Sequence, residues 1–172
     1  DRGGFHSDAS RRNGELTNIG KSDFWTQHEQ SIATTQEPAA VNYEWAPSEC
    51  ADERFPMQIV RGDFIFPDDQ RLYIPDQKVI HNGWGEYNSS HVVGDPEKPL
   101  PDRMEISWFS FTENRFYSGM FQLGIDDLEA KFAEGFAHPD TGEPTTYNRI
   151  LVGLAPEGGV TVWLGGYGVL RL

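Results

Sequence analysis

The chain has 172 residues, of which 37% are hydrophobic and 13% aromatic, and its formal net charge is −13 at pH 7. This length and composition predict one folded domain with a core rich in large rings, and they argue against a disordered polymer. The excess of acidic side chains repels phosphate backbones, which argues against nucleic acid as a partner and favours a protein with a basic surface.

The 18 glycines and 11 prolines indicate many turns and short strands. Cys50 is the single cysteine, so the chain can form neither an intramolecular disulfide nor a cysteine-based metal cluster. We expect Cys50 to be a small buried residue rather than a reactive thiol. No apolar run approaches the ~20 residues that a membrane-spanning helix needs.

Residues 1–40 are polar and of mixed charge, and the apolar anchors worth noting are Phe24, Trp25 and Ile32. Two interpretations stay open: a tether between an anchor and the domain, or an arm that packs over a sheet. We therefore divide the chain into a polar N-terminal arm or tether, residues 1–40, and a single β-rich domain, residues 41–172. Because the chain begins without Met on a polar stretch, we also expect an N-terminus that was processed or shortened.

The domain opens with a predicted half-buried strand, because Val41, Tyr43 and Trp45 alternate with polar residues. Pro47 is expected to end this strand, since proline cannot donate a hydrogen bond to a neighbouring strand.

Residues 57–61 and 64–66 form the next extended stretch, either as one strand or as two strands separated at residues 62–63. Residues 67–70 read Pro-Asp-Asp-Gln, a sequence typical of a turn, and residues 71–74 are predicted to return as a short strand.

From residue 75 to residue 101 no regular period survives. Long ordered loops of this kind often carry function, so we predict a variable surface here. Trp84 lies between two glycines and is followed by Glu86 and Tyr87. Its ring could stack on a sugar, although a structural plug is the interpretation that we favour.

Residues 103–111 and 115–123 are predicted to form a hairpin around a turn at residues 112–114. The apolar parity changes near Trp108, which indicates either a bulge or a strand that is covered on both faces. Residues 125–136 form the one convincing helix, whose apolar side chains recur every three or four positions and should lie on one face of the sheet.

The predicted fold is built around a C-terminal hairpin, whose two apolar strands are residues 149–154 and 160–164. Pro156 suits the first corner of the turn, and Gly158 or Gly159 can supply a positive φ. Because both strands are apolar on both faces, we place them near the middle of a sheet. The predicted fold is mainly β (α+β), an antiparallel sheet or β-sandwich built from hairpins with one amphipathic helix packed on it.

The motifs of common catalytic sites are missing from the sequence. Gly-x-Ser-x-Gly does not occur, the histidines lack the spacing of a zinc site, and the glycines at residues 165–168 do not open a helix that could hold a phosphate. Paired carboxylates for glycoside chemistry stay open, because 27 acidic residues form pairs by chance. We predict no enzyme, no metal and no cofactor.

The second half of the chain carries an ordered set of segments: Leu100-Pro101, Ile106-Ser107-Trp108, Phe109-Ser110, Glu113, Arg115-Phe116-Tyr117, Gly119, Phe121, Leu123, the helix, Tyr147, Val152-Gly153-Leu154-Ala155-Pro156 and residues 159–165. This order resembles the bacterial lipoprotein family of domain of unknown function 2931 over about residues 56–170, with no counterpart for residues 1–40. The Gly-Leu-Ala-Pro segment of the hairpin is the most specific part of the match.

The resemblance implies a periplasmic lipoprotein whose precursor is anchored to the inner or outer membrane through a lipidated cysteine. Cys50 lies too deep in the chain to be that cysteine, so any membrane contact would run through an anchor that this chain lacks. Members of the family are similar in context to immunity proteins for secreted antibacterial effectors, often phospholipases of the type VI secretion system. The family has no established catalytic residues.

We therefore predict an immunity protein that binds a cognate effector toxin and neutralises it sterically. The alternative is a carbohydrate- or envelope-binding module. The predicted partner-binding residues are Trp84, Glu86 and Tyr87 in the long loop, together with Asp68 and Asp69 on what we take to be a neighbouring turn.

Overall fold

The structure is a computed structural model that describes residues 41–87 and 93–172. All of these residues belong to one unit of the chain, residues 40–172. The predicted arm or tether over residues 1–40 lies outside the described residues.

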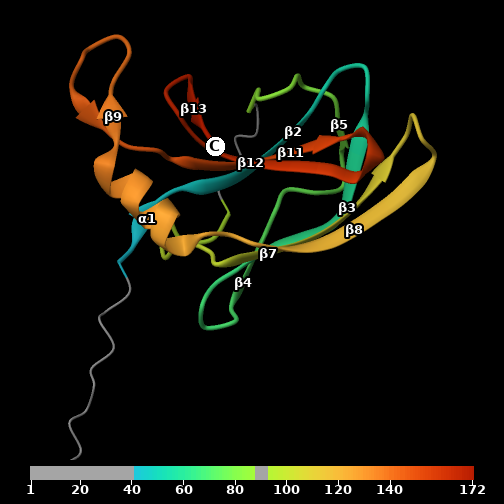
Figure 1. Cartoon of the computed structure of the whole chain (residues 1–172), viewed down its shortest axis with the longest axis horizontal. Coiled ribbons are helices and arrows are strands. Elements are labelled where there is room, and N and C mark those ends of the chain that lie inside the picture. The colour runs from blue at the N-terminus through green and yellow to red at the C-terminus, as the bar shows by residue number, and fades with distance from the viewer. Residues whose placement is uncertain (1–40, 88–92) are drawn as a thin grey trace, which may run out of the picture. The chain divides into compact units, whose positions relative to one another are not determined.

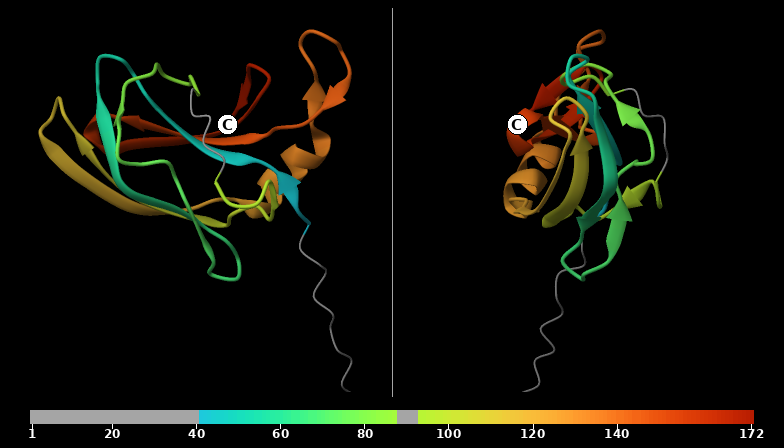
Figure 2. Two further views of the ribbon diagram at one scale, coloured as in Figure 1. Left: turned by 180° about the vertical axis from the view of Figure 1, so that it is seen from behind. Right: turned by 90° about the vertical axis from the view of Figure 1, so that its right-hand side faces the viewer.

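Over the described residues the fold is mainly β with a single α-helix, as predicted. Its two larger sheets pack their inner faces together as a sandwich (Figures 1 and 2). One sheet has four strands in the order β13-β12-β11-β2, and the other has five, in the order β4-β3-β7-β8 with β5 paired to β3. The four-stranded sheet consists of β2 (Ala46–Ala51), β11 (Arg149–Ala155), β12 (Gly159–Gly166) and β13 (Val169–Arg171). The five-stranded sheet consists of β3 (Met57–Ile65), β4 (Arg71–Tyr73), β5 (Val79–Ile80), β7 (Arg103–Ser110) and β8 (Arg115–Gln122).

Two short strand pairs complete the β structure. They are β1 (Tyr43–Glu44) with β6 (Glu97–Lys98), and β9 (Phe136–Ala137) with β10 (Pro144–Thr145).

The predicted C-terminal hairpin is confirmed, and its strands β11 and β12 are the two central strands of their sheet. Their inward residues pair directly, for example Val152 with Val162. A short 3₁₀ turn, Pro156–Gly158, connects the strands. Gly158 supplies the predicted positive φ (76°), Glu157 also has a positive φ (60°), and Gly159 is extended.

The first predicted strand does not end at Pro47. The chain instead forms the two-residue strand β1 and then β2, which contains Pro47 and runs parallel to β11, an exception to the antiparallel pairing that we predicted. Because β2 is the last of the described strands in its sheet, proline costs it no hydrogen bond to a further strand among them.

Of the two alternatives for the parity change near Trp108, a bulge or a strand covered on both faces, the structure has a bulge, but it lies on the neighbouring strand. The pairing of β3 with β7 shifts between Ile59 and Arg61, whereas β7 alternates strictly between buried and half-buried residues. Ser110 is buried and points inward, although it is polar. Phe109, the residue before it, therefore points outward. The same bulge lets residues 57–65 run as one strand rather than two.

Helix α1 (Ile125–Glu134) ends two residues earlier than predicted. Gly135 terminates it with φ 59°, and a Cβ there would lie 2.2 Å from the carbonyl oxygen of Thr145. The helix lies at one end of the sandwich (Figure 1), where Phe132 packs against Tyr43 and Tyr147 with ring centroids 5.1 and 5.9 Å away.

Candidate functional site

The outward residues of the five-stranded sheet form a surface that combines exposed aromatic rings with fixed charges. We call it the outer face. Strict alternation in β7 turns Phe109 outward, and the register with β8 places Phe116 directly beside it. The ring centroids of these two residues are 4.8 Å apart, and Phe111 packs 5.0 Å from Phe109. Phe116 is 70% exposed, so these three rings, the aromatic patch, are available to a partner.

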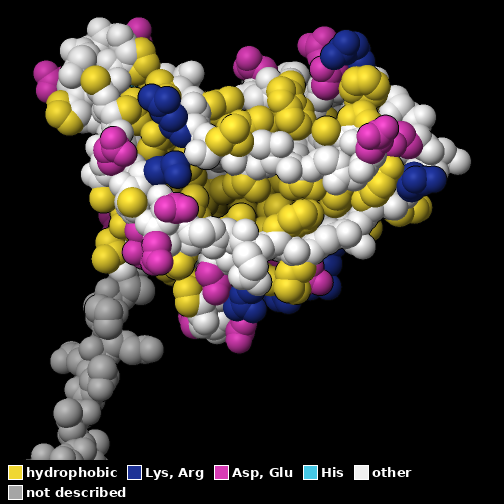
Figure 3. All heavy atoms as spheres, in the orientation of Figure 1, with side chains coloured by type: hydrophobic (Ala, Val, Ile, Leu, Met, Phe, Trp, Pro, Cys, Tyr) yellow, Lys and Arg dark blue, Asp and Glu magenta, His cyan; other side chains and the backbone are white. Residues whose placement is uncertain are grey.

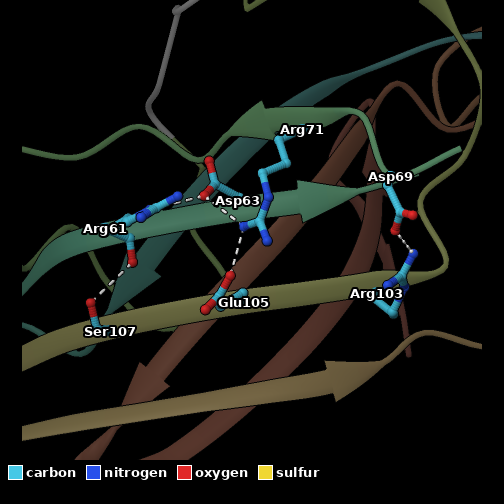
Figure 4. Close-up of polar contacts among 7 residues, drawn as sticks. All are labelled: Arg61, Asp63, Asp69, Arg71, Arg103, Glu105 and Ser107. Carbon is cyan, nitrogen blue, oxygen red and sulfur yellow. Dashed lines mark hydrogen bonds and ion pairs between the residues drawn. The ribbon is translucent and has the colours of Figure 1, made fainter. Parts of the chain in front are cut away.

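An ion-pair network stiffens the other end of the outer face (Figure 4). Asp63, which is only 9% exposed, accepts hydrogen bonds from Arg61 at 3.1 Å and from Arg71 at 3.2 Å. Arg71 also donates to Glu105 at 2.6 Å. The hydrogen bond from Arg71 to Glu105 is the main cause that raises the pKa of the Arg71 guanidinium, with Asp63 adding to it. The network joins β3, β4 and β7 and fixes their side chains before any partner arrives.

A shallow depression of about 270 Å³ separates the network from the aromatic patch. Ser107 and Ser118 pair across β7 and β8 at its centre, where two small side chains leave room. Arg61 and Glu105 contribute its charged rim, and Met120 its apolar one. The outer face therefore offers apolar area, hydroxyl groups and both signs of charge to another macromolecule.

Asp68 and Asp69, two of the predicted site residues, lie on the β3–β4 turn. Asp68 closes the turn by accepting hydrogen bonds from the backbone and side chain of Gln70 at 3.1 and 2.9 Å. Asp69 has a φ of 64° and accepts a hydrogen bond from Arg103 at 2.8 Å. That bond, followed by one to Asp102, raises the pKa of the Arg103 guanidinium. Asp69 thus reaches the border of the outer face (Figure 4).

The Trp84 loop, residues 82–87, covers the four-stranded sheet instead. Trp84 packs edge-on against Trp163, with ring centroids 5.0 Å apart, and Trp163 in turn lies over Gly153. Trp84 remains 43% exposed, so it is a packed plug with one accessible part. The backbone N–H of Gly85 donates to the Sγ of Cys50 at 3.3 Å, which ties the loop to β2.

Glu86 and Tyr87 form the end of the same loop, and each accepts a hydrogen bond. The Tyr87 hydroxyl accepts a hydrogen bond from the N–H of Gly168 at 3.0 Å, and the backbone carbonyl of the exposed Glu86 accepts one from Asn82. In Figures 1 and 2 this loop lies at the top of the view and the β3–β4 turn at the bottom. The structure therefore does not bring Asp68 and Asp69 together with the Trp84 loop, so the turn is not a neighbour of that loop.

Cys50 is fully buried, as expected. Burial raises the pKa of its thiol to about 11, against the lowering effect of the hydrogen bond from Gly85. The thiol is therefore protonated at neutral pH. Among residues 41–87 and 93–172 no group of three or more His, Cys, Asp or Glu side chains is arranged to hold a metal ion. No helix within those ranges is both long and apolar enough to cross a bilayer.

Sequence reasoning missed the aromatic patch, although its signal was present. The parity change at Phe109 and Phe111 was interpreted as irregularity or two-sided burial, whereas it reflects two rings that face outward. A serine at the inward position 110 was the clue, because it ends the apolar inward series without ending the strand.

Taken together, these observations define a mainly β sandwich whose five-stranded sheet carries exposed aromatic rings and an ion-pair network on its outer face. The family model described as "Protein of unknown function (DUF2931)" matches residues 27–170, and the chain belongs to this family. The match begins at residue 27 rather than near residue 56, so the expectation that residues 1–40 lack any counterpart is wrong for residues 27–40. No curated protein and no solved structure shows a significant match to the chain.

Proposed function

We propose that this protein is an immunity protein that binds a secreted antibacterial toxin, of the lipase or phospholipase type, and blocks it without catalysis. The single observation that carries the binding role is the aromatic patch, in which Phe116 keeps 70% of its surface exposed on a rigid sheet. Exposed apolar surface of this kind marks sites of protein contact, and buried aromatic anchors dominate the energy of such contacts.

The rigidity of the outer face supports steric blocking. The backbone of β7 is held between two strands, and Asp63 fixes Arg61 and Arg71 before binding. A surface that is ordered in advance loses little conformational entropy on association, so more of the contact energy appears as affinity. Such a surface can cover the entrance to a toxin's active site or hold its lid.

The charge of the domain supports a basic partner. Residues 41–172 contain 10 basic and 21 acidic side chains, a net charge of −11. Five of the basic residues, Arg54, Arg61, Arg71, Lys78 and Arg103, are already paired with carboxylates of this chain. The remaining acidic surface would steer a basic toxin surface toward the protein and raise the association rate.

We further propose a periplasmic location, with a lipidated precursor anchored to the inner or outer membrane. The resemblance of the C-terminal half to the lipoprotein family supports this assignment. A lipid-attacking toxin would meet its target in the same compartment, so an immunity protein there could bind it before it acts.

Inhibition of the toxin tests the proposal directly. The purified chain would be titrated against the lipase effector encoded beside it, with fluorogenic lipid hydrolysis as the readout at low and moderate salt. We expect stoichiometric inhibition. If Phe116 is an anchor, Phe116→Ala should raise the inhibition constant by roughly 30-fold or more.

The matched control is Tyr167→Ala, which removes a 50% exposed aromatic ring from the β12–β13 turn of the other sheet. It should change the inhibition constant by less than about twofold. Full activity of the toxin at saturating protein, at both salt concentrations, would overturn the proposed function.

The alternative, a carbohydrate- or envelope-binding module, is favoured by one observation, the 43% exposed Trp84 beside Trp163. It predicts a shift in tryptophan fluorescence when peptidoglycan fragments are added, and loss of that shift in Trp84→Ala. It also predicts that the chain leaves the lipase active.

A further inference from the structure

Strand β8 ends the five-stranded sheet with an edge that no other strand of the described residues covers. It is eight residues long, and Arg115 is its only charged residue. Natural proteins usually protect such edges with charges, prolines or bulges, because exposed backbone N–H and C=O groups pair readily with another strand. The pairing of β8 with β7 runs through all eight residues without a bulge. The edge is therefore regular and ready for strand addition.

An apolar slot opens beside this edge, between β8 and β12 (Figure 3). In that view a hollow lined by hydrophobic side chains runs between the two strands. The inward residues Tyr117 and Phe121 of β8 and Val160 and Val162 of β12 border the core as partly buried side chains. β13 pairs only with residues 164–166 of β12, so among the described strands the first half of β12 has β11 as its only partner.

Both ends of the slot are fixed. At one end the Oε1 of Glu113 accepts hydrogen bonds from the Tyr117 hydroxyl at 2.9 Å and from the N–H of Glu157 at 3.0 Å. This joins the β7–β8 turn of one sheet to the β11–β12 turn of the other, and we call it the Glu113 latch. At the other end lies α1, which packs its apolar side chains, Leu128 among them, against the core. The slot therefore has a set width rather than an adjustable one.

We propose that an extended segment of the toxin adds to the free edge of β8 as a further strand and places alternate apolar side chains in the slot. A strand that matches β8 would be about 27 Å long, at roughly 3.4 Å for each residue. Backbone hydrogen bonds would supply the pairing, and the slot would select apolar side chains at every second position. This inference rests on the proposed function, because it names the part of the same partner that the chain recognises.

The acidic residues at the two ends of the slot indicate which charges should flank the toxin segment. Asp126 and Asp127 are exposed in the first turn of α1, directly after β8, and the exposed Glu157 stands at the other end of the slot. Lysine or arginine on either side of the apolar positions would therefore be favoured, whereas an acidic segment would be repelled.

Residue-resolved hydrogen exchange measured by NMR tests the proposal on the full chain. In the free protein every second amide of β8, the set that points to the open edge, should exchange fast. Addition of saturating toxin should slow this set by at least about 100-fold, because the amides become hydrogen-bonded in a stable sheet. The matched internal control is β4, the strand at the opposite edge of the same sheet, whose exchange should change by less than about threefold.

Each other outcome overturns the inference in a distinct way. A complex that inhibits the toxin but leaves β8 exchange unchanged refutes strand addition and leaves the proposed function standing. Slow exchange in the dilute free chain would show that the chain covers its own edge. Slow exchange that appears only when the concentration of the chain is raised would assign the edge to a second copy. Absence of any complex removes the proposed function together with the inference.

Discussion

The packing of the Trp84 loop makes Gly153→Ala a stringent test of the four-stranded sheet. Gly153 lies in the central strand β11 beneath the ring of Trp163. A Cβ at this position would lie 2.4 Å from Cζ3 of Trp163 and 3.2 Å from Cη2 of Trp84. Because ordinary carbon contacts are about 3.5–4.0 Å, the Trp163 ring would have to retreat by at least ~1 Å.

Two opposing effects set the magnitude. Alanine restricts the unfolded chain more than glycine does, which should stabilise the fold by about 0.5–1 kcal/mol where the backbone is extended. Overpacking of a close-packed site costs about 1–3 kcal/mol, and here the added Cβ also approaches Trp84, whose ring packs edge-on against Trp163. We expect the clash to win, with a net loss of about 1–2 kcal/mol in the free energy of unfolding.

Urea denaturation followed by circular dichroism measures this loss, and a double-mutant cycle assigns its cause. In a Trp163→Ala background the 2.4 Å clash is absent and only the milder 3.2 Å approach to Trp84 remains, so Gly153→Ala should become close to neutral. The coupling energy between the two positions should therefore reach about 1–2 kcal/mol. An equal cost of Gly153→Ala in both backgrounds would refute the steric reasoning, and with it the assignment of Trp84 as a plug over Trp163.

Two further predictions concern titratable groups. Cys50 is buried with a thiol pKa raised to about 11, so iodoacetamide at pH 8 should leave the native chain unlabelled over a period that labels the urea-unfolded chain fully; comparable rates would contradict the burial. The hydrogen bond from the N–H of Glu157, followed by those of Ser110 and Tyr117, holds the pKa of Glu113 below its usual 4.5. A depressed carboxyl pKa contributes stability that is fully present above pH 4.5 and is lost as the pH falls through the folded-state pKa. The urea midpoint of the wild type should therefore drop more than that of Glu113→Gln as the pH is lowered below 4.5. Parallel midpoint curves for the two proteins would show that the Glu113 latch does not couple to folding.

The parts of the fold that were predictable from sequence are those that depend on neighbours along the chain. The hairpin of β11 and β12 follows from alternation and from a Pro-Glu-Gly-Gly connection, and α1 follows from apolar spacing that is closed by Gly135. In each case the residues that determine the element are less than about 20 positions apart, so local periodicity contains the information.

The parts that were not predictable depend on pairing between distant segments. Pro47 was expected to end a strand because its lack of an N–H is a local property. It is tolerated because β2 lies at a sheet edge beside β11, about 100 residues further along the chain, and no local pattern reveals that edge. The same limit explains the candidate site, since the Trp84 loop and the β3–β4 turn are close in sequence and yet cover different sheets.

Strand β8 places a residue that supports the core beside one that we propose for binding. Its inward residue Tyr117 stacks on the buried Trp108 at 5.5 Å and donates to Glu113, so its truncation should damage the core and the Glu113 latch. Its outward neighbour Phe116 packs against the ring of Phe109 and is 70% exposed. Burial of Phe116 in the free protein would stabilise the fold, yet the fold leaves it in water. Under the proposed function, a partner that covers the ring offsets the cost of that exposure, so the exposed Phe116 rather than the half-buried Tyr117 is the residue that we propose for binding.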